Sequence, residues 1–425
     1  ERTGEGDIAG ALSRVTGLSV VGGGFVYVRG LGDRYSLALL NGSPLPSPEP
    51  LKRVVPLDLF PTSVIASSLV QKTYSANFPG EFGGGVINLT TKAIPRETFL
   101  SMSVDASGNS ETTNKLGYTY YGSSTDWSGF DNGNRNLAPA LAGYFASGQR
   151  ISTGGVDTRA IAGQLVTGRN AVVQRDNNLP ANGSANITGG TNFEIGDDAT
   201  MGVLFNAGYS NKWRTRDTLQ QTASTRDLGQ KEADFQKVIT DNRMVVNGLL
   251  GFGIEAGEQK LRWTNIFIRD TLKQARLGIG TRQATSPTAT LLQQDTAWYE
   301  RQLINSQLVG EFKLSPDVNF SFRVGYANSK REAPDELSFE YYRSNQASDP
   351  FGALFINRLN NGQQGSAEVS YSNLSEDLWS GSADLSFKIT PDMTGTVGYA
   401  YSDTVRRTER RDFQFVAPGG TPVTS

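Results

Sequence analysis

The chemistry open to this chain is limited by two residue types that it lacks. Its 425 residues contain neither histidine nor cysteine. Histidine is the usual general base and metal ligand near neutral pH, and thiolate nucleophiles, thiolate metal sites and disulfides all need cysteine. Ser–His and Cys–His catalysis is therefore excluded, and no bare transition-metal site is expected. We expect neither enzyme activity nor a bound cofactor.

Two pairs of neighbouring carboxylates, Asp197-Asp198 and Asp335-Glu336, remain as candidates for acid–base chemistry. Both lie where the sequence predicts turns or loops, and carboxylates in such places are usually solvated. We therefore interpret both pairs as surface charges. The run Gly22–Gly24 is no phosphate-binding loop, because it opens onto no predicted helix and no Lys-Ser or Lys-Thr follows it.

Two further stretches could contact a ligand. Residues 125–136, TDWSGFDNGNRN, are rich in acids, amides and aromatic rings, which suits a sugar or a loosely held Ca²⁺. Their spacing departs from the calcium-loop pattern, so an ordinary surface loop is the alternative. Tyr341, Tyr342 and Arg343 fall in a predicted loop and are open to ligand contact or to simple loop packing. Neither stretch identifies a ligand-binding residue.

The composition narrows the class of protein without assigning it. Glycine is frequent, at 48 of 425 residues, and charged residues make up 19%, below the ~25% of ordinary globular chains. The formal net charge of −2 gives no sign of nucleic-acid binding. No apolar run of about 18 residues predicts a membrane helix. The first residue is not Met and no signal peptide follows, so we expect a mature or trimmed chain.

The first ninety residues predict a small domain of mixed α and β structure. Asp7 is placed as the N-cap of a helix over 8–15, which Gly17 closes. Asn41-Gly42 predicts a tight turn, and four prolines within 43–50 predict an extended loop. The other predicted elements are strands over 18–21, 25–28, 36–40, 69–74 and 86–91, and a short helix that begins at Pro61 and turns Val64 and Ile65 inward.

A glycine-rich stretch, FPGEFGGGVINLTTK at 78–92, separates this domain from the rest of the chain. Together with VRGLGDRYSLALLNGSPLP at 28–46 and VPLDLFPTSVIASSLVQKTY at 55–74, it resembles the plug domain of TonB-dependent outer-membrane transporters. In that family the plug sits inside a 22-stranded barrel and blocks its lumen. The resemblance implies a plug domain over 1–95, truncated at its N-terminus, and the N-terminal part of a transmembrane β-barrel over 96–425.

The resemblance also implies which plug residues meet the barrel wall. Three features match the family pattern: an Arg-Gly pair in the plug hairpin, two charged residues after it, and the glycine-rich segment that ends the plug. Such residues would hold plug and wall together through charged pairs, and solvated loop charges are the alternative. The energy-coupling box of the family precedes the plug and is not visible in this sequence. The residues implied are Arg29, Gly30, Asp33, Arg34, Glu81, Phe82, Gly83 and Gly84.

Beyond residue 96 the chain alternates between apolar and small or polar residues. Strands of about ten residues with one apolar face are the signature of an outer-membrane barrel. The opposite face can carry Arg323 or Lys388 because it points into a wet lumen. A soluble antiparallel sandwich also alternates and is the alternative. The alternating runs are 201–209, 246–254, 320–326, 385–389 and 393–401, and the aromatic residues assigned to interfacial girdles are Tyr209, Trp213, Trp263, Trp298, Tyr299, Tyr326, Tyr399 and Tyr401.

The predicted connections are short on one side and long on the other, as in outer-membrane barrels, whose short turns are periplasmic. A first strand over 97–106 leaves no pair of crossings within 107–183. We interpret 116–121 as loop or as an extension of that strand, and its pattern could equally be a strand. About nine crossings follow, so we expect a fragment with roughly the first half of a barrel. Short turns are predicted at 196–198, 257–259, 315–317 and 390–392, and long connections at 213–242, 271–296 and 329–378.

The resemblance favours a receptor over an enzyme. It implies an integral protein of the Gram-negative outer membrane, in contact with its lipid, that binds a small nutrient such as a ferric siderophore, cobalamin or an oligosaccharide. The TonB–ExbB–ExbD energy complex would be its partner. The main alternative is a passive porin or surface-adhesion barrel, which has no reason to carry a separate mixed domain. A secreted enzyme on a β scaffold is a third hypothesis, against which the missing histidine argues.

Overall fold

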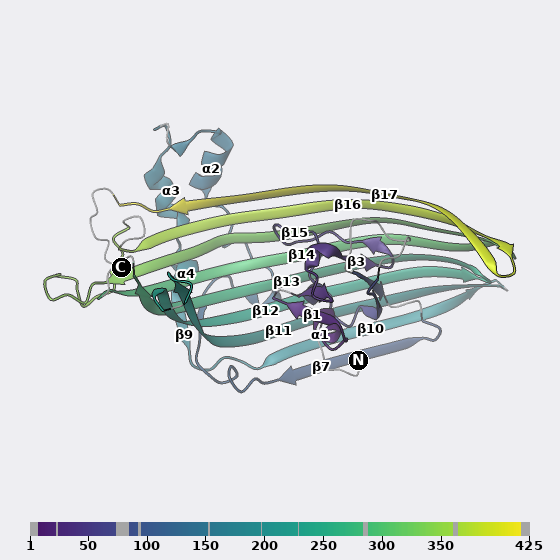
Figure 1. Cartoon of the computed structure of the whole chain (residues 1–425), viewed down its shortest axis with the longest axis horizontal. Coiled ribbons are helices and arrows are strands. Elements are labelled where there is room, and N and C mark those ends of the chain that lie inside the picture. The colour runs from purple at the N-terminus through teal and green to yellow at the C-terminus, as the bar shows by residue number, and fades with distance from the viewer. Residues whose placement is uncertain are drawn as a thin grey trace.

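The computed structural model describes residues 7–22, 24–73, 85–91, 95–151, 154–196, 198–227, 229–283, 288–359 and 364–417. Figure 1 shows a small N-terminal domain that lies across a large sheet of long strands. The chain is mainly β-structure, as the sequence predicts. No helix among these residues is both long and apolar enough to cross a membrane.

The N-terminal domain combines one short helix with two small sheets. Its elements are α1 (Ile8–Leu12), β1 (Leu18–Val21), β2 (Phe25–Val28), η1 (Asp33–Tyr35), β3 (Ser36–Leu40), β4 (Ser43–Pro44), η2 (Leu57–Leu59), β5 (Ile65–Gln71) and β6 (Gly85–Thr91). β1 and β2 form a hairpin, and the second sheet has the order β4-β3-β6-β5, in which β3 and β6 run parallel. Asp7 Oδ1 accepts a hydrogen bond from the Gly10 backbone N at 2.9 Å, which confirms the predicted N-cap.

Turns inside this domain follow the sequence in one place and depart from it in another. Asn41 and Gly42 both have positive φ, 49° and 84°, so the predicted tight turn between β3 and β4 is confirmed. The helix predicted from Pro61 is wrong, because the chain makes a single turn there and β5 begins at Ile65. β-branched Val64 and Ile65 favour an extended strand, and both are buried as expected.

The first helix is also shorter than predicted. α1 ends at Leu12, where the Ser13 backbone N bonds to the Ala9 and Gly10 carbonyl oxygens. Val15, which the periodicity placed on the buried side of this helix, is exposed. A further helical turn would therefore have no apolar surface to cover.

The large sheet has nine strands in the part of the chain that the structure describes. They are β7 (Phe99–Ser107), β10 (Asn182–Ile195), β11 (Ala199–Ala223), β12 (Lys231–Ala256), β13 (Gln259–Arg282), β14 (Thr290–Ser315), β15 (Val318–Arg343), β16 (Ser366–Thr390) and β17 (Met393–Gln414). Neighbours in the order β17-β16-β15-β14-β13-β12-β11-β10-β7 pair antiparallel. The sheet is open, with β7 and β17 at its edges. The count of nine agrees with the prediction.

The strands are far longer than the predicted ten residues. β11 to β17 contain 22 to 26 residues each, so most of the predicted long connections are strand instead. The apolar alternation stops partway along each strand, whereas the backbone hydrogen bonds continue, since they do not depend on which side chains are present. The short turns are confirmed, and Gly196 and Gly257 occupy them with φ of 67° and 58°.

The two faces of the sheet differ in chemistry. The inner face, defined here as the side on which the N-terminal domain lies, places Leu249, Ile268 and Leu303 in the core of that domain. The outer face carries apolar side chains along the part of each strand near the short turns, which we call the apolar band. Exposed members of the band are Phe205, Leu250, Ile254, Trp263, Ile304, Val324, Trp379, Leu385, Val397, Tyr399 and Tyr401. This arrangement matches the predicted alternation.

The long connection between β7 and β10 folds onto the outer face, beyond the apolar band. It holds β8 (Gly117–Tyr120), η3 (Asp126–Ser128), α2 (Pro139–Ser147), α3 (Thr158–Leu165), α4 (Gly168–Ala171) and β9 (Val173–Asp176). Tyr118 N donates to Thr240 Oγ1 at 3.0 Å. Thr240 lies on the outer face, because it is three residues along β12 from Arg243, which lies on the inner face. β8 pairs only with β9, so this connection adds no strand to the large sheet, as predicted.

Candidate functional site

The N-terminal domain and the inner face share one apolar core. Leu40, Leu59 and Phe60 of the domain are fully buried and belong to the same cluster as Ile268 and Leu303 of the sheet. Burying a side chain of this size stabilises a fold by roughly 1.5–3 kcal/mol. The domain is therefore seated on the sheet by packing, and its polar contacts determine where it sits.

A cluster of four charged residues lies at the centre of this seat. Asp58 of η2 meets Arg243 of β12 and Arg301 of β14, with Oδ2 3.1 Å and 3.0 Å from their Nη2 atoms. Both arginines also bind Asp270 of β13, Arg243 through two bonds of 2.9 and 2.6 Å. The two acids and two arginines alternate, so each charge is held by its neighbours.

A second set of contacts fixes the proline-rich segment after β4. Arg301 Nη1 donates to Glu49 Oε1 at 3.2 Å, and Arg406 of β17 donates to the carbonyl oxygens of Glu49 and Lys52. Glu376 of β16 accepts from the Ser47 backbone N at 3.2 Å and from Arg406 at 3.1 Å. The segment thus binds the sheet largely through its backbone groups.

The tip of the β3–β4 hairpin is bound by a buried glutamine. Gln307 of β14 is 1% exposed, and its Nε2 donates to Ser43 Oγ at 2.6 Å and to the Leu40 carbonyl O at 3.4 Å. Asn41 Nδ2 donates to Gln307 Oε1 at 3.1 Å. The side-chain amide of Gln307 is therefore both donor and acceptor, which fixes the hairpin at one position on the sheet.

Replacing Gln307 by alanine is expected to loosen this hairpin by about 1–3 kcal/mol, because the buried Ser43 hydroxyl loses its partner and Asn41 Nδ2 loses one of its two. Hydrogen exchange of the Asn41 amide, which bonds to the Leu89 carbonyl O, measures the effect. Gln302→Ala is the matched control, since Gln302 lies on the same strand and faces outward, and it is expected to change exchange little. Equal exchange rates in the two variants would contradict the prediction.

The residues that the resemblance implied lie elsewhere in the domain. Arg29 and Gly30 form the turn after β2 with φ of 53° and 77°, and the side chains of Arg29 and Arg34 are exposed. Among the described residues neither arginine forms an ion pair with the sheet, and only the backbone of Asp33 is described, in η1. Glu81, Phe82, Gly83 and Gly84 lie outside the described residues. Their proposed contacts with the wall stay a prediction.

The sequence carried a signal for the contacts that the structure does describe. Arg243, Asp270 and Arg301 occupy the polar positions of alternating strands, as do Arg323 and Lys388, which the sequence placed on the wet face. Arg323 is paired with Asp384 at 3.6 Å, and Lys388 is exposed. The charged partners on the domain have no sequence periodicity, because Glu49 lies in the proline-rich segment and Asp58 in the single turn of η2. Only the fold brings them to the sheet.

Beyond the seat, the inner face contains a cavity of about 350 Å³. It lies farther from the short turns than the charged cluster, because Gln274 in its lining is four residues beyond Asp270 on β13. Tyr299 donates to Glu336 Oε2 at 2.8 Å, and Ser338 donates to Asp295 Oδ1 at 2.6 Å. The lining has charges of both signs, from Lys237, Arg276, Arg410, Asp295, Glu336 and Glu368. Such a lining can bind a polar ligand through hydrogen bonds and ion pairs.

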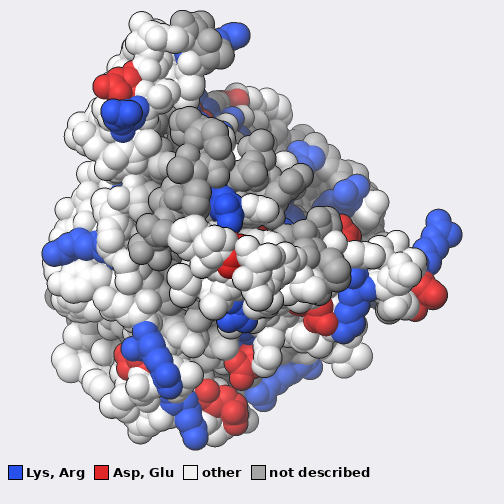
Figure 2. Space-filling model, turned by 90° about the vertical axis from the view of Figure 1, so that its left-hand side faces the viewer, with Lys and Arg blue, Asp and Glu red and all other residues white. Residues whose placement is uncertain are grey.

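The strand ends beyond this cavity present charges of mixed sign. Figure 2 views the molecule from the end opposite the short turns, which we call the end of the hairpin tips. Lysine, arginine, aspartate and glutamate side chains are interspersed over this end. The described residues contain no group of three or more acidic side chains placed to hold a metal ion.

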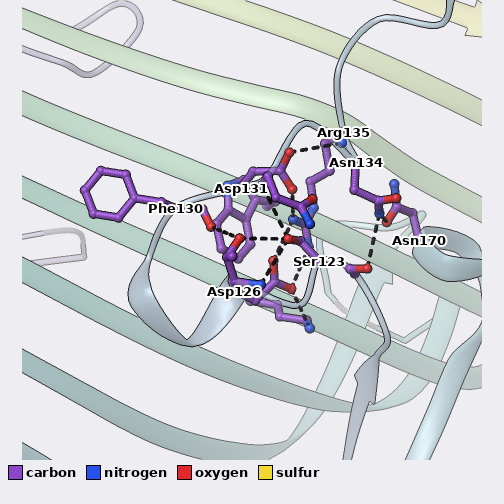
Figure 3. A network of polar contacts seen from close by, with 12 residues as sticks. Ser123, Asp126, Phe130, Asp131, Asn134, Arg135 and Asn170 are labelled. Atoms are coloured by element: carbon purple, nitrogen blue, oxygen red, sulfur yellow. Dashed lines mark hydrogen bonds and ion pairs between the residues drawn. The ribbon is translucent and has the colours of Figure 1, made fainter.

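Residues 125–136 form a tight polar cluster on the outer face (Figure 3). Arg135 binds Asp126 through two bonds of 2.8 Å and Asp131 through one of 2.6 Å. Lys273 of β13 also binds Asp126, at 2.7 Å. These acids are already paired with protein cations, which leaves the Ca²⁺ interpretation without support. Burial raises the pKa of the neighbouring Tyr120, whose hydroxyl donates to the Ala297 carbonyl O.

The structure changes several aromatic assignments. Tyr299, which was placed in an interfacial girdle, lines the inner-face cavity instead. Trp298 was placed in an interfacial girdle, which is wrong, because it is 0% exposed and lies 4.1 Å beneath the Arg135 guanidinium. Tyr341, Tyr342 and Arg343 lie in β15 rather than in a loop, and Arg343 stacks on Phe355. The alternation of the strands fixes only which face a side chain is on, and the long connection then covers part of that face.

The carboxylate of Asp335 is buried, although the sequence suggested a solvated charge. It is 8% exposed and sits at a bulge of β15 with φ 59°, beyond the apolar band. Oδ2 accepts from Asn170 Nδ2 at 2.5 Å, and Oδ1 has no hydrogen-bond partner among the described residues. Burial raises the pKa of Asp335 to about 6. Asp198 of the other pair is exposed, as expected.

This raised pKa predicts a pH-dependent stability. The folded protein binds the proton of Asp335 more tightly than the unfolded chain, in which the pKa of an aspartate is about 3.9. The stabilisation of the fold by protonated Asp335 is therefore present below about pH 4 and is lost as the pH rises to about 6. Asp335→Asn is expected to raise the free energy of unfolding by about 1–2 kcal/mol at pH 8 and to leave it unchanged at pH 4. Denaturant unfolding at both pH values measures this, and a difference that is the same at both would contradict it.

Comparison with known proteins assigns the N-terminal domain to a family. Residues 1–86 match the model of the TonB-dependent Receptor Plug Domain, which confirms the resemblance seen in the sequence. This part of the chain is a plug domain of the TonB-dependent receptor type, and we call it the plug from here on. The comparison with curated proteins found no match.

Several solved structures are similar to the whole chain at low identity. The ferric citrate transporter FecA in its unliganded form shares 12% identity, with 97% of this chain and 57% of that chain covered and a TM-score of 0.27. The siderophore receptor PiuA from Acinetobacter baumannii shares 13% identity, with 96% and 60% covered and a TM-score of 0.29. The copper transporter OprC shares 11% identity, with 96% and 58% covered and a TM-score of 0.30. This chain thus spans somewhat more than half the length of these proteins.

Proposed function

We propose that this chain is the plug and the N-terminal part of the barrel of a TonB-dependent outer-membrane receptor, with the boundary near residue 95. One observation carries the proposal. A plug domain is seated through buried charges on the polar inner face of a sheet whose outer face is apolar. A sheet with this division of faces suits lipid on one side and an aqueous lumen on the other.

In this proposal the protein binds and changes conformation without breaking bonds. The apolar band contacts the lipid of the outer membrane, and the plug obstructs the lumen. The TonB–ExbB–ExbD complex supplies the energy that displaces the plug. The charged cluster around Asp58 holds the closed state, and its separation leaves both arginines of the sheet paired, because Asp270 keeps them.

The proposed ligand is a small nutrient that enters from the end of the hairpin tips. The inner-face cavity of about 350 Å³ lies between those tips and the charged cluster, so we propose it as part of the ligand path. Its lining of both charge signs suits a polar ligand. A ferric siderophore, cobalamin and an oligosaccharide all remain in the proposal.

Growth of a strain that lacks the gene tests this function. Loss of growth under iron limitation, reversed by free iron, would assign a siderophore, and loss on one glycan as sole carbon source would assign a carbohydrate. Uptake should also stop when tonB is deleted. Uptake that continues without TonB, and without the plug residues 7–92, would instead support a passive porin.

A further inference from the structure

The polar cluster of residues 122–136 occupies a part of the outer face that the proposed transport does not use. The Gly129 carbonyl O accepts hydrogen bonds of 2.8 Å from both Arg269 Nε and Thr271 Oγ1 of β13. The Tyr209 hydroxyl of β11 donates to the Trp127 carbonyl O. The cluster is therefore fixed to two separate strands by its backbone. We call it the outer shelf.

The strand register places this shelf at the edge of the apolar band. Tyr209, Val246 and Arg269 form one outward row across β11, β12 and β13. Two residues nearer the short turns, the next outward row is apolar or small and contains Phe267 and Ile304. The row after that contains the exposed Phe205 and Leu250. Arg269 is thus the first outward charge above the band on β13, and it holds the shelf.

Two aromatic side chains of the shelf remain uncovered. Trp127 is 66% exposed and Phe130 is 40% exposed. Figure 3 shows the ring of Phe130 pointing away from the polar residues of the cluster, while the Arg269 guanidinium lies 4.3 Å from its centroid. The ion pairs behind these rings hold the backbone, so the exposure is not that of a loose loop. Rigid, exposed aromatic side chains at this level offer apolar surface to a neighbouring phase or molecule.

We propose that the outer shelf rests in the head-group region of the outer leaflet, with Trp127 and Phe130 as its anchors. The proposal rests on the membrane location given above. Tryptophan prefers the membrane–water interface, where its apolar ring and its N–H group meet both phases. The shelf continues the apolar band outward by one step, at the row where the strands turn polar.

The charges of the shelf favour lipid over an ionic protein partner. The charges of the shelf and of the strands beneath it balance, and every ion pair among them is between 2.6 and 2.8 Å. The cations are Arg135, Lys273 and Arg269, and the acids are Asp126, Asp131 and Glu300. No net charge is therefore left to attract a partner of one sign. Trp127 and Phe130 are the exposed large apolar side chains of residues 122–136, and the other exposed residues there are Ser124, Asn132, Gly133 and Asn136.

Quenching of tryptophan fluorescence by brominated lipid tests the shelf. The intact protein is reconstituted in phosphatidylcholine vesicles with bromine near the head groups or near the chain ends. Trp127→Phe is expected to remove a component that head-group bromine quenches more strongly than chain-end bromine. Trp379→Phe, in the apolar band, is the matched control and should remove a component quenched by deeper bromine.

The outcomes separate the shelf from the membrane location itself. If Trp379→Phe lowers quenching and Trp127→Phe does not, the shelf is not in the lipid and the inference is overturned. If no variant changes quenching, the sheet itself is not in the membrane and the proposed function fails with it. Trp127 emission that depends on the protein-to-lipid ratio would assign the two rings to a second copy of the chain, which also overturns the inference.

Discussion

Replacing Arg301 by alanine is expected to release the plug from the wall. Arg301 binds three acids, Glu49 and Asp58 of the plug and Asp270 of the sheet. Without it, Arg243 alone faces Asp58 and Asp270, and Glu49 loses its side-chain cation. Removing one partner of a buried ion pair costs about 3–5 kcal/mol, because the remaining charges are desolvated and repel.

Such a loss should be visible in the plug and in the pore. An opening free energy lowered by about 3 kcal/mol raises the hydrogen exchange of β3 and β6 amides by roughly 100-fold. In planar bilayers the variant should show conductance that the parent protein lacks. Arg262→Ala is the control, since its pair with Glu311 is exposed and worth about 0–1 kcal/mol. A variant that stays closed, with unchanged exchange, would show that packing alone seats the plug.

The sequence predicts the plug well because its signals are local. Asp7 caps a helix and Asn41-Gly42 makes a turn through contacts within a few residues, so both could be recognised without the fold. The wrong helix after Pro61 has the same origin. Proline suits the first helical turn, but β5 pairs with β6 between residues 15 to 26 positions apart, and this pairing outweighs that preference.

The sequence predicts the large sheet only within the apolar band. Apolar alternation marks the band, where the apolar side chains of one face are exposed, and there the predicted faces of Phe205 and Leu250 are confirmed. Beyond the band both faces are polar or covered by the long connection, so the pattern disappears while the strands continue. Trp298 shows the consequence, because its outward position is right and its exposure is not.

The contacts of the site escaped prediction because they join distant parts of the chain. Glu49 and Asp58 meet Arg301 across more than 240 residues, and no spacing in the sequence encodes such a pairing. The alternation of the strands predicts only the partners on the sheet, because the period of two places Arg243 and Asp270 on the inner face.

Replacing Arg135 by alanine is expected to detach the outer-face connection from the sheet. Its side chain is 2% exposed, and it binds both oxygens of Asp126, one of Asp131 and the face of Trp298. The variant leaves Asp131 without its cation and removes the cover of Trp298. We expect a cost of about 3–5 kcal/mol, since Lys273 is then the only cation paired with Asp126.

The detachment should appear as proteolysis confined to residues 108–181, about 100-fold faster than in the parent protein, with red-shifted emission from Trp298. Arg175→Ala is the matched control, because Arg175 lies exposed in the same connection and donates one bond to Asn177. It should leave both readouts unchanged. If Arg135→Ala also leaves them unchanged, other buried attachments hold the connection, such as the apolar contacts of α2 and α3 with Leu337 and the bond of Asn170 to Asp335. A loss in Arg135→Ala alone would instead mean that one buried cation fixes the whole outer shelf.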